Sequence, residues 1–219
     1  MDIKPSDISI RDRYTLLIGA IVPRPIAFVS TLSANGEPNL APYSFFNGVG
    51  SNPMTLLFCP VNLPNGSEKD TLRNSKPVAE GGTGEFVVNV AVESYSHEVS
   101  AAAESLPSSE SEFDLTRLDT APSRVIKPPR VAASPVAFEC RTLQVIRTNP
   151  GAPGGGNIVL GEVVHVYVQD EIIDERLRID PAKLQAIGRM GGLSFCRTGD
   201  RFELARGRAA LETVSGEKP

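Results

Sequence analysis

The stretch from residue 23 to residue 60 constrains the fold more than any other part of the chain. Residues 25–32 are β-branched and aromatic, Asn35-Gly36 is a strong short hairpin signal, and residues 54–59 form a continuous apolar run. Together they predict two or three short strands joined by turns. Between them, residues 43–47 place two adjacent phenylalanines beside a hydroxyl and an amide, a mixture that suits a flat amphipathic ligand.

Composition narrows the class of protein. A chain of 219 residues with 41% hydrophobic content is long enough for one well-buried core, and its net charge of −4 argues against a general nucleic-acid binder. The three cysteines are too few and too scattered for a disulfide framework or a zinc site, which indicates reduced thiols. No apolar run approaches the ~20 residues of a membrane helix. We expect a soluble, cytoplasmic protein without a nucleic-acid or membrane partner.

Many short strands without an alternating strand–helix rhythm predict a mainly β barrel and not a doubly wound sheet. Beyond the first hairpin, we expect strands over residues 86–92, 136–148 and 158–169, and a last hairpin over 195–204 that turns at 198–200. Capping residues, alanines and a first-turn proline predict a few short helices over residues 9–19, 70–74, 94–106 and 180–188.

The whole chain, residues 1–219, is expected to form a single domain. Residues 107–133 are rich in serine, proline and charge without a sustained period, so we interpret them as a long surface loop over the barrel mouth. Residues 206–219 are expected to be a loosely held tail.

Three motifs closely resemble the flavin reductase-like family. They are residues 24–31 (RPIAFVST), 39–47 (NLAPYSFFN) and 51–53 (SNP), and later segments at 128–131 and 134–140 extend the resemblance over nearly the whole chain. The resemblance implies a split β-barrel with Greek-key-like connections that binds FMN, similar to flavoredoxin. It also implies a homodimer with the flavin near the subunit interface.

The resemblance implies a set of cofactor-binding residues. Ser30 and Thr31 would line the ribityl chain, and Lys69, Asp70 and Thr71 would form the turn at the phosphate. Ser44, Phe45, Phe46 and Asn47 would form the ring slot and its rim, and Asn89 would reach the cofactor. His165 would lie beside the flavin or the nicotinamide, and Arg189 would neutralise the phosphate of FMN or of the nicotinamide nucleotide.

Each candidate also has a structural interpretation. Adjacent phenylalanines in a strand face opposite sides, so at least one of Phe45 and Phe46 packs ordinarily. Asn89, in an apolar strand, either ties down a neighbouring backbone segment or reaches the cofactor. His165 is read alternatively as a structural histidine, and Arg189 as a surface arginine at a helix end.

The expected reaction is the reduction of FMN by NADH or NADPH, and the sequence does not distinguish between these two donors. Hydride transfer needs no side-chain acid or base, so no catalytic residue and no metal ligand is predicted. The chain has no dinucleotide, P-loop, HExxH or G-x-S-x-G signature. The alternatives are an electron-transfer flavoprotein with tightly bound FMN and a non-enzymatic split-barrel binding module. A monooxygenase or an electron-acceptor protein is the expected further partner.

Overall fold

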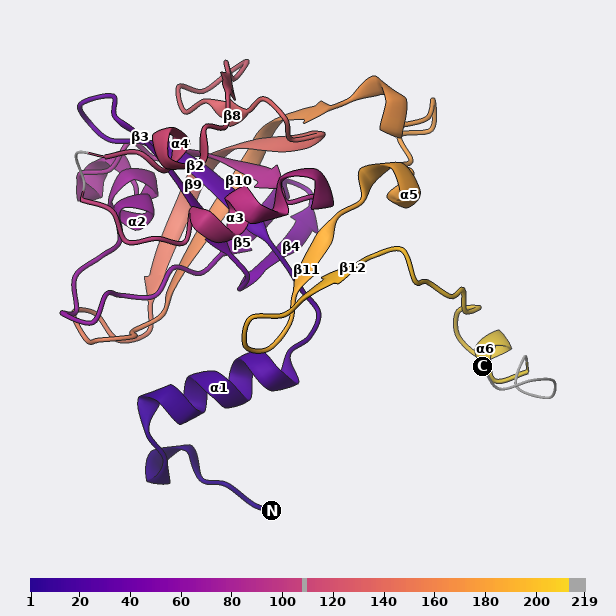
Figure 1. The fold of residues 1–219 in the computed structure, drawn as a ribbon, viewed down its shortest axis with the longest axis horizontal. Helices are drawn as coiled ribbons and strands as arrows, with labels where there is room; N and C mark the ends of the chain where they lie inside the picture. The colour runs from indigo at the N-terminus through magenta and orange to yellow at the C-terminus, as the bar shows by residue number, and fades with distance from the viewer. Residues whose placement is uncertain (108–109, 213–219) are drawn as a thin grey trace.

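The computed structural model describes residues 1–107 and 110–212. Its main feature is a seven-stranded sheet, ordered β3-β2-β6-β9-β10-β5-β4, in which every neighbouring pair is antiparallel. The strands are β2 (Ala27–Leu32), β3 (Pro38–Tyr43), β4 (Phe46–Ser51), β5 (Met54–Phe58), β6 (Glu85–Val90), β9 (Val136–Arg147) and β10 (Asn157–Val168). The sheet is the expected split β-barrel, with β3 and β4 as its edges (Figure 1).

Two smaller sheets accompany the barrel. A three-stranded sheet joins β1 (Arg24–Pro25), β11 (Ile187–Arg189) and β12 (Phe195–Arg197), so residues far apart in the sequence lie side by side. A two-stranded ribbon joins β7 (Thr120–Ala121) and β8 (Arg130–Val131).

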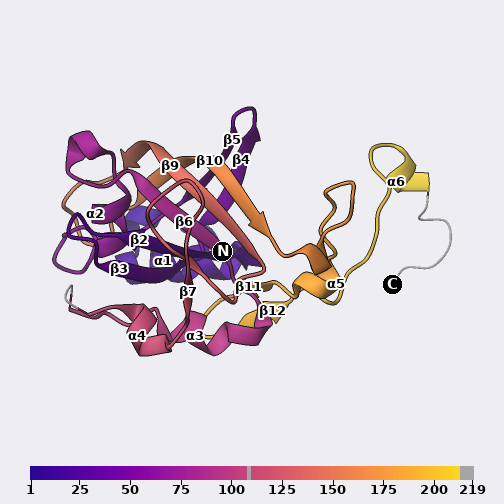
Figure 2. The same ribbon diagram turned by 90° about the horizontal axis from the view of Figure 1, so that it is seen from above.

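The helices are short apart from the first. The α-helices are α1 (Ile10–Ala20), α2 (Asp70–Ser75), α3 (Ser96–Ala101), α4 (Glu112–Thr116), α5 (Pro181–Leu184) and α6 (Ala209–Glu212). The 3-10 turns are Pro5–Asp7, Val78–Glu80, Glu93–Tyr95 and Asp170–Ile172. The expected N-cap of α1 is confirmed, because the Ser9 hydroxyl accepts a hydrogen bond from the Asp12 amide at 3.1 Å. Figure 2 shows α3 and α4 together on one side of the barrel, with α2 near its end.

The core lies on both faces of β2, which explains why residues 27–31 of this strand are all buried. Ala27 and Val29 belong to the cluster inside the barrel, with Phe58 and Phe86. Phe28, which alternates with them, belongs to a second cluster beneath α3 and α4. Both faces are therefore covered, and the helices that cover the outer face lie where β3 ends.

Residues 107–133 contain more structure than the expected surface loop. They carry α4 and the β7–β8 ribbon, and Phe113, Ile126 and Val131 are buried. These three apolar residues lack the regular spacing of a helix or a strand. The sequence pattern therefore did not predict that the segment packs against the barrel.

Three sequence predictions near the ends of elements are wrong. The helix expected over residues 94–106 is a 3-10 turn followed by α3, which ends at Ala101. The helix expected to end at Gly188 stops at Leu184, because Gln185 adopts a left-handed conformation (φ 51°). Gly188 instead lies in β11, where an added Cβ would be 2.9 Å from the Cys196 sulfur. The last hairpin joins β11 to β12 and does not turn at residues 198–200.

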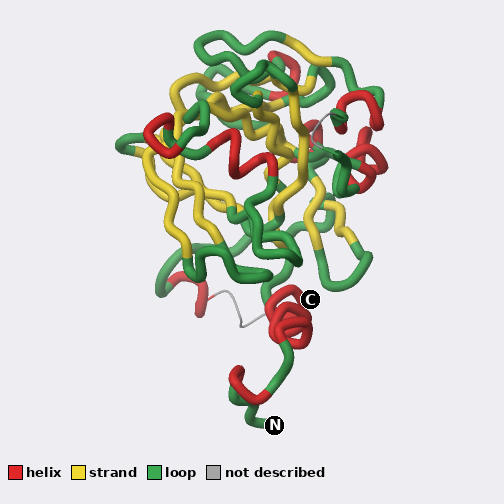
Figure 3. Tube along the Cα trace, turned by 90° about the vertical axis from the view of Figure 1, so that its left-hand side faces the viewer, coloured by secondary structure: helices red, strands yellow, loops and turns green. Residues whose placement is uncertain are grey.

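The two ends of the described chain lie outside the barrel. No residue of α1 is buried, and Figure 3 shows this helix below the barrel. Its apolar side chains Ile10, Tyr14 and Leu17 are 49–60% exposed. After β12 the chain runs away from the barrel to α6 (Figure 1), and residues 213–219 of the expected tail lie outside the described residues.

Among the described residues, none of the helices has the length and apolar character needed to cross a bilayer. A cytoplasmic location stays a prediction.

Candidate functional site

A groove runs along the edge strand β3, between the start of α2 and the end of α3. Its first part, the proximal hollow, has a volume of about 130 Å³ and is lined by residues that include Asn39, Tyr43, Lys69, Thr71 and Glu112. Its second part, the central hollow, has a volume of about 210 Å³ and is lined by residues that include Tyr14, Ser44, Arg189 and Phe195. Pro42 and Ala103 line both hollows, so the two hollows adjoin each other.

Two residues that line the proximal hollow, Lys69 and Tyr43, have polar groups without a partner among the described residues. The Lys69 ammonium makes no hydrogen bond or ion pair with any described residue, and burial lowers the pKa of Lys69. The Tyr43 hydroxyl is buried and has no hydrogen-bond partner, although Thr71 lies close enough to oppose the rise that burial causes in the pKa of Tyr43. A buried donor without a partner costs about 1–3 kcal/mol, so the Tyr43 hydroxyl is suited to a ligand that accepts a hydrogen bond, and the half-buried Lys69 ammonium is suited to an anion.

Three acidic residues also line the proximal hollow, but two of them are engaged elsewhere. Asp70 forms an ion pair with Arg73. Glu112 accepts a hydrogen bond from the Leu40 amide at 2.9 Å, and burial raises the pKa of its carboxyl group. The third, Glu104, lines the hollow from the segment that follows α3.

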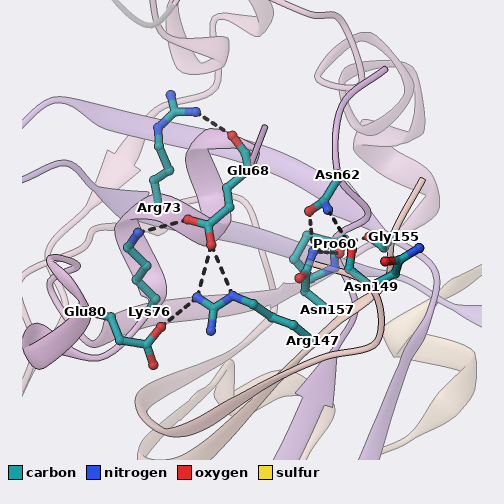
Figure 4. Close-up of polar contacts among 10 residues, drawn as sticks. All are labelled: Pro60, Asn62, Glu68, Arg73, Lys76, Glu80, Arg147, Asn149, Gly155 and Asn157. Carbon is teal, nitrogen blue, oxygen red and sulfur yellow. Dashed lines mark hydrogen bonds and ion pairs between the residues drawn. The ribbon is translucent and has the colours of Figure 1, made fainter. Parts of the chain in front are cut away.

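The segment that carries Lys69 and Thr71 is anchored by the preceding residue, Glu68 (Figure 4). The Glu68 carboxylate accepts hydrogen bonds from Lys76 Nζ at 2.9 Å and from Arg147 at 3.0 and 3.2 Å. Arg147 also donates to Glu80 at 2.6 Å. These bonds hold both ends of α2 against β9, which places the lysine–threonine turn at a defined distance from β3.

The central hollow is organised by Arg24, which is 3% exposed. Its guanidinium donates to the Ser44 hydroxyl at 3.1 Å, to the carbonyls of Ile18 and Ile21 at 2.7 Å, and to the Met190 carbonyl at 3.0 Å. One side chain therefore joins the end of α1, the β11–β12 turn and the Ser44 side chain.

Aromatic rings border the central hollow. The Tyr14 ring meets Phe45 edge to face at a centroid distance of 6.4 Å. The Arg189 guanidinium lies 4.5 Å from the centroid of Phe195, which is 38% exposed. A planar ligand in this hollow would meet aromatic side chains and a cation together.

The groove brings five of the residues predicted from the sequence together: Ser44, Lys69, Asp70, Thr71 and Arg189. Phe45 contacts Tyr14 beside the groove. Phe46 packs against the cluster inside the barrel, and Asn47 is exposed on β4.

Three other predicted residues are fully buried and bonded within the protein. Ser30 donates to the Pro129 carbonyl at 2.5 Å, and Thr31 accepts from the Asn74 amide at 3.1 Å. Asn89 donates to the Phe28 carbonyl at 3.0 Å and accepts from the Val131 amide at 2.8 Å. Of the two interpretations of Asn89, the structure shows the one in which its side chain hydrogen-bonds to neighbouring backbone groups.

His165 lies on β10, opposite Glu139 on β9, and lines neither hollow. Its Nδ1 is 3.2 Å from a Glu139 carboxylate oxygen, within ion-pair distance but not aligned for a hydrogen bond. The same carboxylate accepts from the amides of Arg124 and Val125 at 2.7 and 2.8 Å. The contacts of His165 are therefore structural ones, and the described residues contain no cluster of potential metal ligands.

Sequence reasoning missed Tyr14, Asn39, Tyr43 and Glu112 as groove residues. Asn39 and Tyr43 could have been predicted from the sequence pattern. Side chains alternate along a strand, so Asn39, Ala41 and Tyr43 share one face of β3, and all three line the proximal hollow. No such pattern identifies Tyr14 and Glu112, since they reach the groove from distant segments.

The barrel with its lateral groove has the architecture of the split-barrel flavoproteins. A solved chain with a split barrel domain from Shewanella frigidimarina shares the fold with a TM-score of 0.79 at 19% identity, covering 94% of this chain and all of that one (100%). The sequence profile of the flavin reductase like domain matches residues 19–187. The chain belongs to the flavin reductase-like family.

More similar relatives support the same assignment. Component B of nitrilotriacetate monooxygenase from Bacillus cereus is 34% identical with a TM-score of 0.85, and the match covers 93% of this chain and 98% of that one. The 2-nitrobenzoate 2-nitroreductase NbaA of Pseudomonas fluorescens is 32% identical with a TM-score of 0.82, covering 95% and 97%. The uncharacterized protein YwrF of Bacillus subtilis is 36% identical over 91% of this chain and 95% of its own.

Proposed function

We propose that this chain is an FMN-binding oxidoreductase that reduces flavin with NADH or NADPH. The observation that carries the proposal is the pairing of an unpartnered lysine and an unpartnered buried tyrosine hydroxyl at one end of a groove whose other end is aromatic and cationic. FMN has the same polarity, with a phosphate at one end and a planar ring at the other.

Each end of the groove has a defined role in this proposal. Lys69, Thr71 and Tyr43 hold the phosphate, since together they supply one positive charge and two hydroxyls. Ser44 and Arg189 border the ring, and Arg189 supplies positive charge where reduction adds negative charge. When bound, the flavin supplies the hydride-accepting centre. The chain supplies binding and orientation and no side-chain acid or base.

A second copy of the chain is part of the proposal. Neither hollow alone reaches the roughly 300 Å³ at which small-molecule pockets begin, so a flavin in the groove would leave much of its surface uncovered. The apolar residues of α1 lie exposed beside the central hollow, where Tyr14 is a lining residue. Burying them against a partner subunit would close the groove and produce the homodimer implied by the resemblance.

The relatives are consistent with a redox role. One is named as a component of a monooxygenase and another as a nitroreductase. By analogy, we propose a monooxygenase or another electron-acceptor protein as the user of the reduced flavin. The chief alternative is an electron-transfer flavoprotein that keeps its FMN and receives electrons from a protein.

The test is a calorimetric titration of the flavin-free protein with FMN and with FAD, followed by assays of NADH and NADPH oxidation. Saturable FMN binding and donor oxidation that depends on added flavin support the proposed reductase. A bound flavin that neither nicotinamide nucleotide reduces favours the electron-transfer alternative. Absence of saturable binding of either flavin overturns the proposal.

Lys69→Met localises the site. We expect FMN affinity to fall at least tenfold, which corresponds to the loss of one charge-assisted contact. Lys127→Met is the matched control, because Lys127 is exposed and lies outside both hollows. Equal FMN affinity of the two variants would contradict the assignment of the phosphate site to this end of the groove.

A further inference from the structure

Asn39, on the edge strand β3, hydrogen-bonds to Thr71 in the first turn of α2. Its Nδ2 donates to the Thr71 hydroxyl oxygen at 3.1 Å. Both residues line the proximal hollow, and Thr71 is 1% exposed. A hydroxyl has one proton to donate and accepts with its oxygen, so the direction of this bond leaves the Thr71 proton for another acceptor.

The Tyr43 hydroxyl is the neighbouring polar group. It is buried and has no hydrogen-bond partner in the described part of the chain, and the nearby Thr71 opposes the rise that burial causes in the pKa of Tyr43. The two hydroxyls carry two protons, and a bond from one hydroxyl to the other would use only one of them. If Asn39 accepted through its carbonyl oxygen instead, a chain from Tyr43 through Thr71 to Asn39 could use both. Donation by Asn39 therefore keeps at least one proton of the pair available in the hollow.

Other contacts already fix the position of α2. Asn74, on the same helix, donates through Nδ2 to the Thr31 hydroxyl on β2 at 3.1 Å, and it lines neither the proximal nor the central hollow. Leu72 is buried in the cluster inside the barrel. The bond from Asn39 differs from these contacts because it lies at the proximal hollow, where it sets the direction of a hydroxyl.

We propose that Asn39 is a positioning residue for the recognition of the phosphate, an inference that rests on the proposed function. By donating to the Thr71 oxygen, the Asn39 amide directs a proton of the Thr71–Tyr43 pair into the hollow. A phosphomonoester presents acceptor oxygens, so hydroxyls whose protons face it bind it best. Asn39 thus favours a flavin with a terminal phosphate over riboflavin, and it does so through Thr71 and not by direct contact.

The experiment compares the affinities of FMN and riboflavin for the flavin-free protein by fluorescence titration. Asn39→Leu removes the amide at similar size, and Asn39→Ala removes it without added bulk. In both variants we expect FMN affinity to fall about fivefold while riboflavin affinity stays unchanged, so that the ratio of the two affinities falls about fivefold. A purely structural role would lower both affinities together.

Asn74→Leu is the matched control. It removes an equivalent bond from an asparagine amide to a threonine hydroxyl, also on α2, outside the proximal and central hollows. Its ratio of FMN affinity to riboflavin affinity should equal that of the unmodified protein.

A double-mutant cycle with Thr71→Val tests whether Asn39 acts through Thr71. Valine keeps the shape of threonine without its hydroxyl, so Thr71→Val by itself should lower the ratio of FMN affinity to riboflavin affinity. Adding Asn39→Leu should lower this ratio no further, because the hydroxyl that Asn39 orients is absent. Additive losses would show that Asn39 contacts the phosphate directly and would overturn the positioning role.

The other outcomes separate this inference from the proposed function. An unchanged ratio in both Asn39 variants, or equal losses of FMN and riboflavin affinity, would overturn the role of Asn39 while leaving flavin binding intact. Failure of both Asn39 variants to fold, with Asn74→Leu folded, would do the same. Failure of the unmodified protein to bind either flavin would instead overturn the proposed function and this inference with it.

Discussion

The guanidinium of Arg24 donates to the hydroxyl of Ser44 at 3.1 Å, and this contact joins the β1–β11–β12 sheet to the ring end of the groove. The other donors of Arg24 bind carbonyls at the end of α1 and in the β11–β12 turn. The position of the central hollow therefore depends on one buried cation that serves three separate segments.

Arg24→Met is expected to lower the free energy of unfolding by about 2–4 kcal/mol, because three carbonyls and the Ser44 hydroxyl lose a partly buried donor. Arg24→Lys should recover only part of the lost stability, since a single ammonium cannot reproduce the several donors of the planar guanidinium. Urea denaturation measures the change, with the exposed Arg201→Met as control. Equal stability of the two methionine variants would contradict the role assigned to Arg24.

Tyr43→Phe tests the unpartnered hydroxyl. Because this hydroxyl has no hydrogen-bond partner among the described residues, its removal should leave stability unchanged or raise it by about 1 kcal/mol. FMN affinity should nevertheless fall roughly fivefold to tenfold. Tyr95→Phe is the contrasting variant, since the Tyr95 hydroxyl donates to the Val90 carbonyl and its loss should destabilise. A clear loss of stability in Tyr43→Phe would show that the hydroxyl is already bonded.

Lys69 should make the stability of the flavin-free protein depend on pH. Burial lowers the pKa of Lys69, so the folded chain binds this proton less tightly than the unfolded chain, whose lysine titrates near pH ~10.4. Stability contributed by this group therefore rises with pH between the lowered folded pKa and the unfolded pKa. Lys69→Met should melt at a higher temperature than the unmodified protein near neutral pH, and the difference should shrink in that alkaline window. A lower melting temperature for Lys69→Met at neutral pH would contradict the desolvation argument.

The ion pairs of Glu68 should make stability depend on pH in the acidic range. Burial by itself raises the pKa of Glu68, but hydrogen bonds and charges of Lys76 and Arg147 outweigh it and lower that pKa. The stabilisation is complete above the unfolded pKa of ~4.3 and is lost as the pH falls through the lowered folded value. Arg147→Met should cost about 1–3 kcal/mol at pH 7 and progressively less in acid. Chemical denaturation of both proteins across this range is the measurement, and a constant difference would contradict it.

Gly161→Ala tests the packing inside the barrel. An added Cβ on β10 would lie 2.4 Å from the Phe86 ring, so the substitution should destabilise by about 1–3 kcal/mol. Phe86→Leu in the same chain should offset part of that loss by vacating the space. Gly199→Ala is the control, because nothing lies within 4 Å of its added Cβ.

Local patterns predicted the barrel strands well. β2, β5, β6, β9 and β10 all fall within or beside the segments expected from apolar runs, and Asn35-Gly36 turns the β2–β3 hairpin with Gly36 at φ 87°. Helix ends and the β11–β12 hairpin were predicted less well, since pairing between Arg24 and Arg189 depends on segments 165 residues apart. No pattern within one segment reports such a pairing.

The chain itself determined its strands, its first helix cap and the motif-bearing turn at residues 69–71, because each depends on neighbours a few residues away. Only the tertiary structure decided which polar residues face the groove. Ser30, Thr31 and Asn89 bond to buried backbone and side-chain groups, whereas the Tyr43 hydroxyl and the Lys69 ammonium have no partner among the described residues. The physical reason is that a polar side chain's role depends on whether distant segments satisfy its hydrogen bonds, and distant segments meet only on folding.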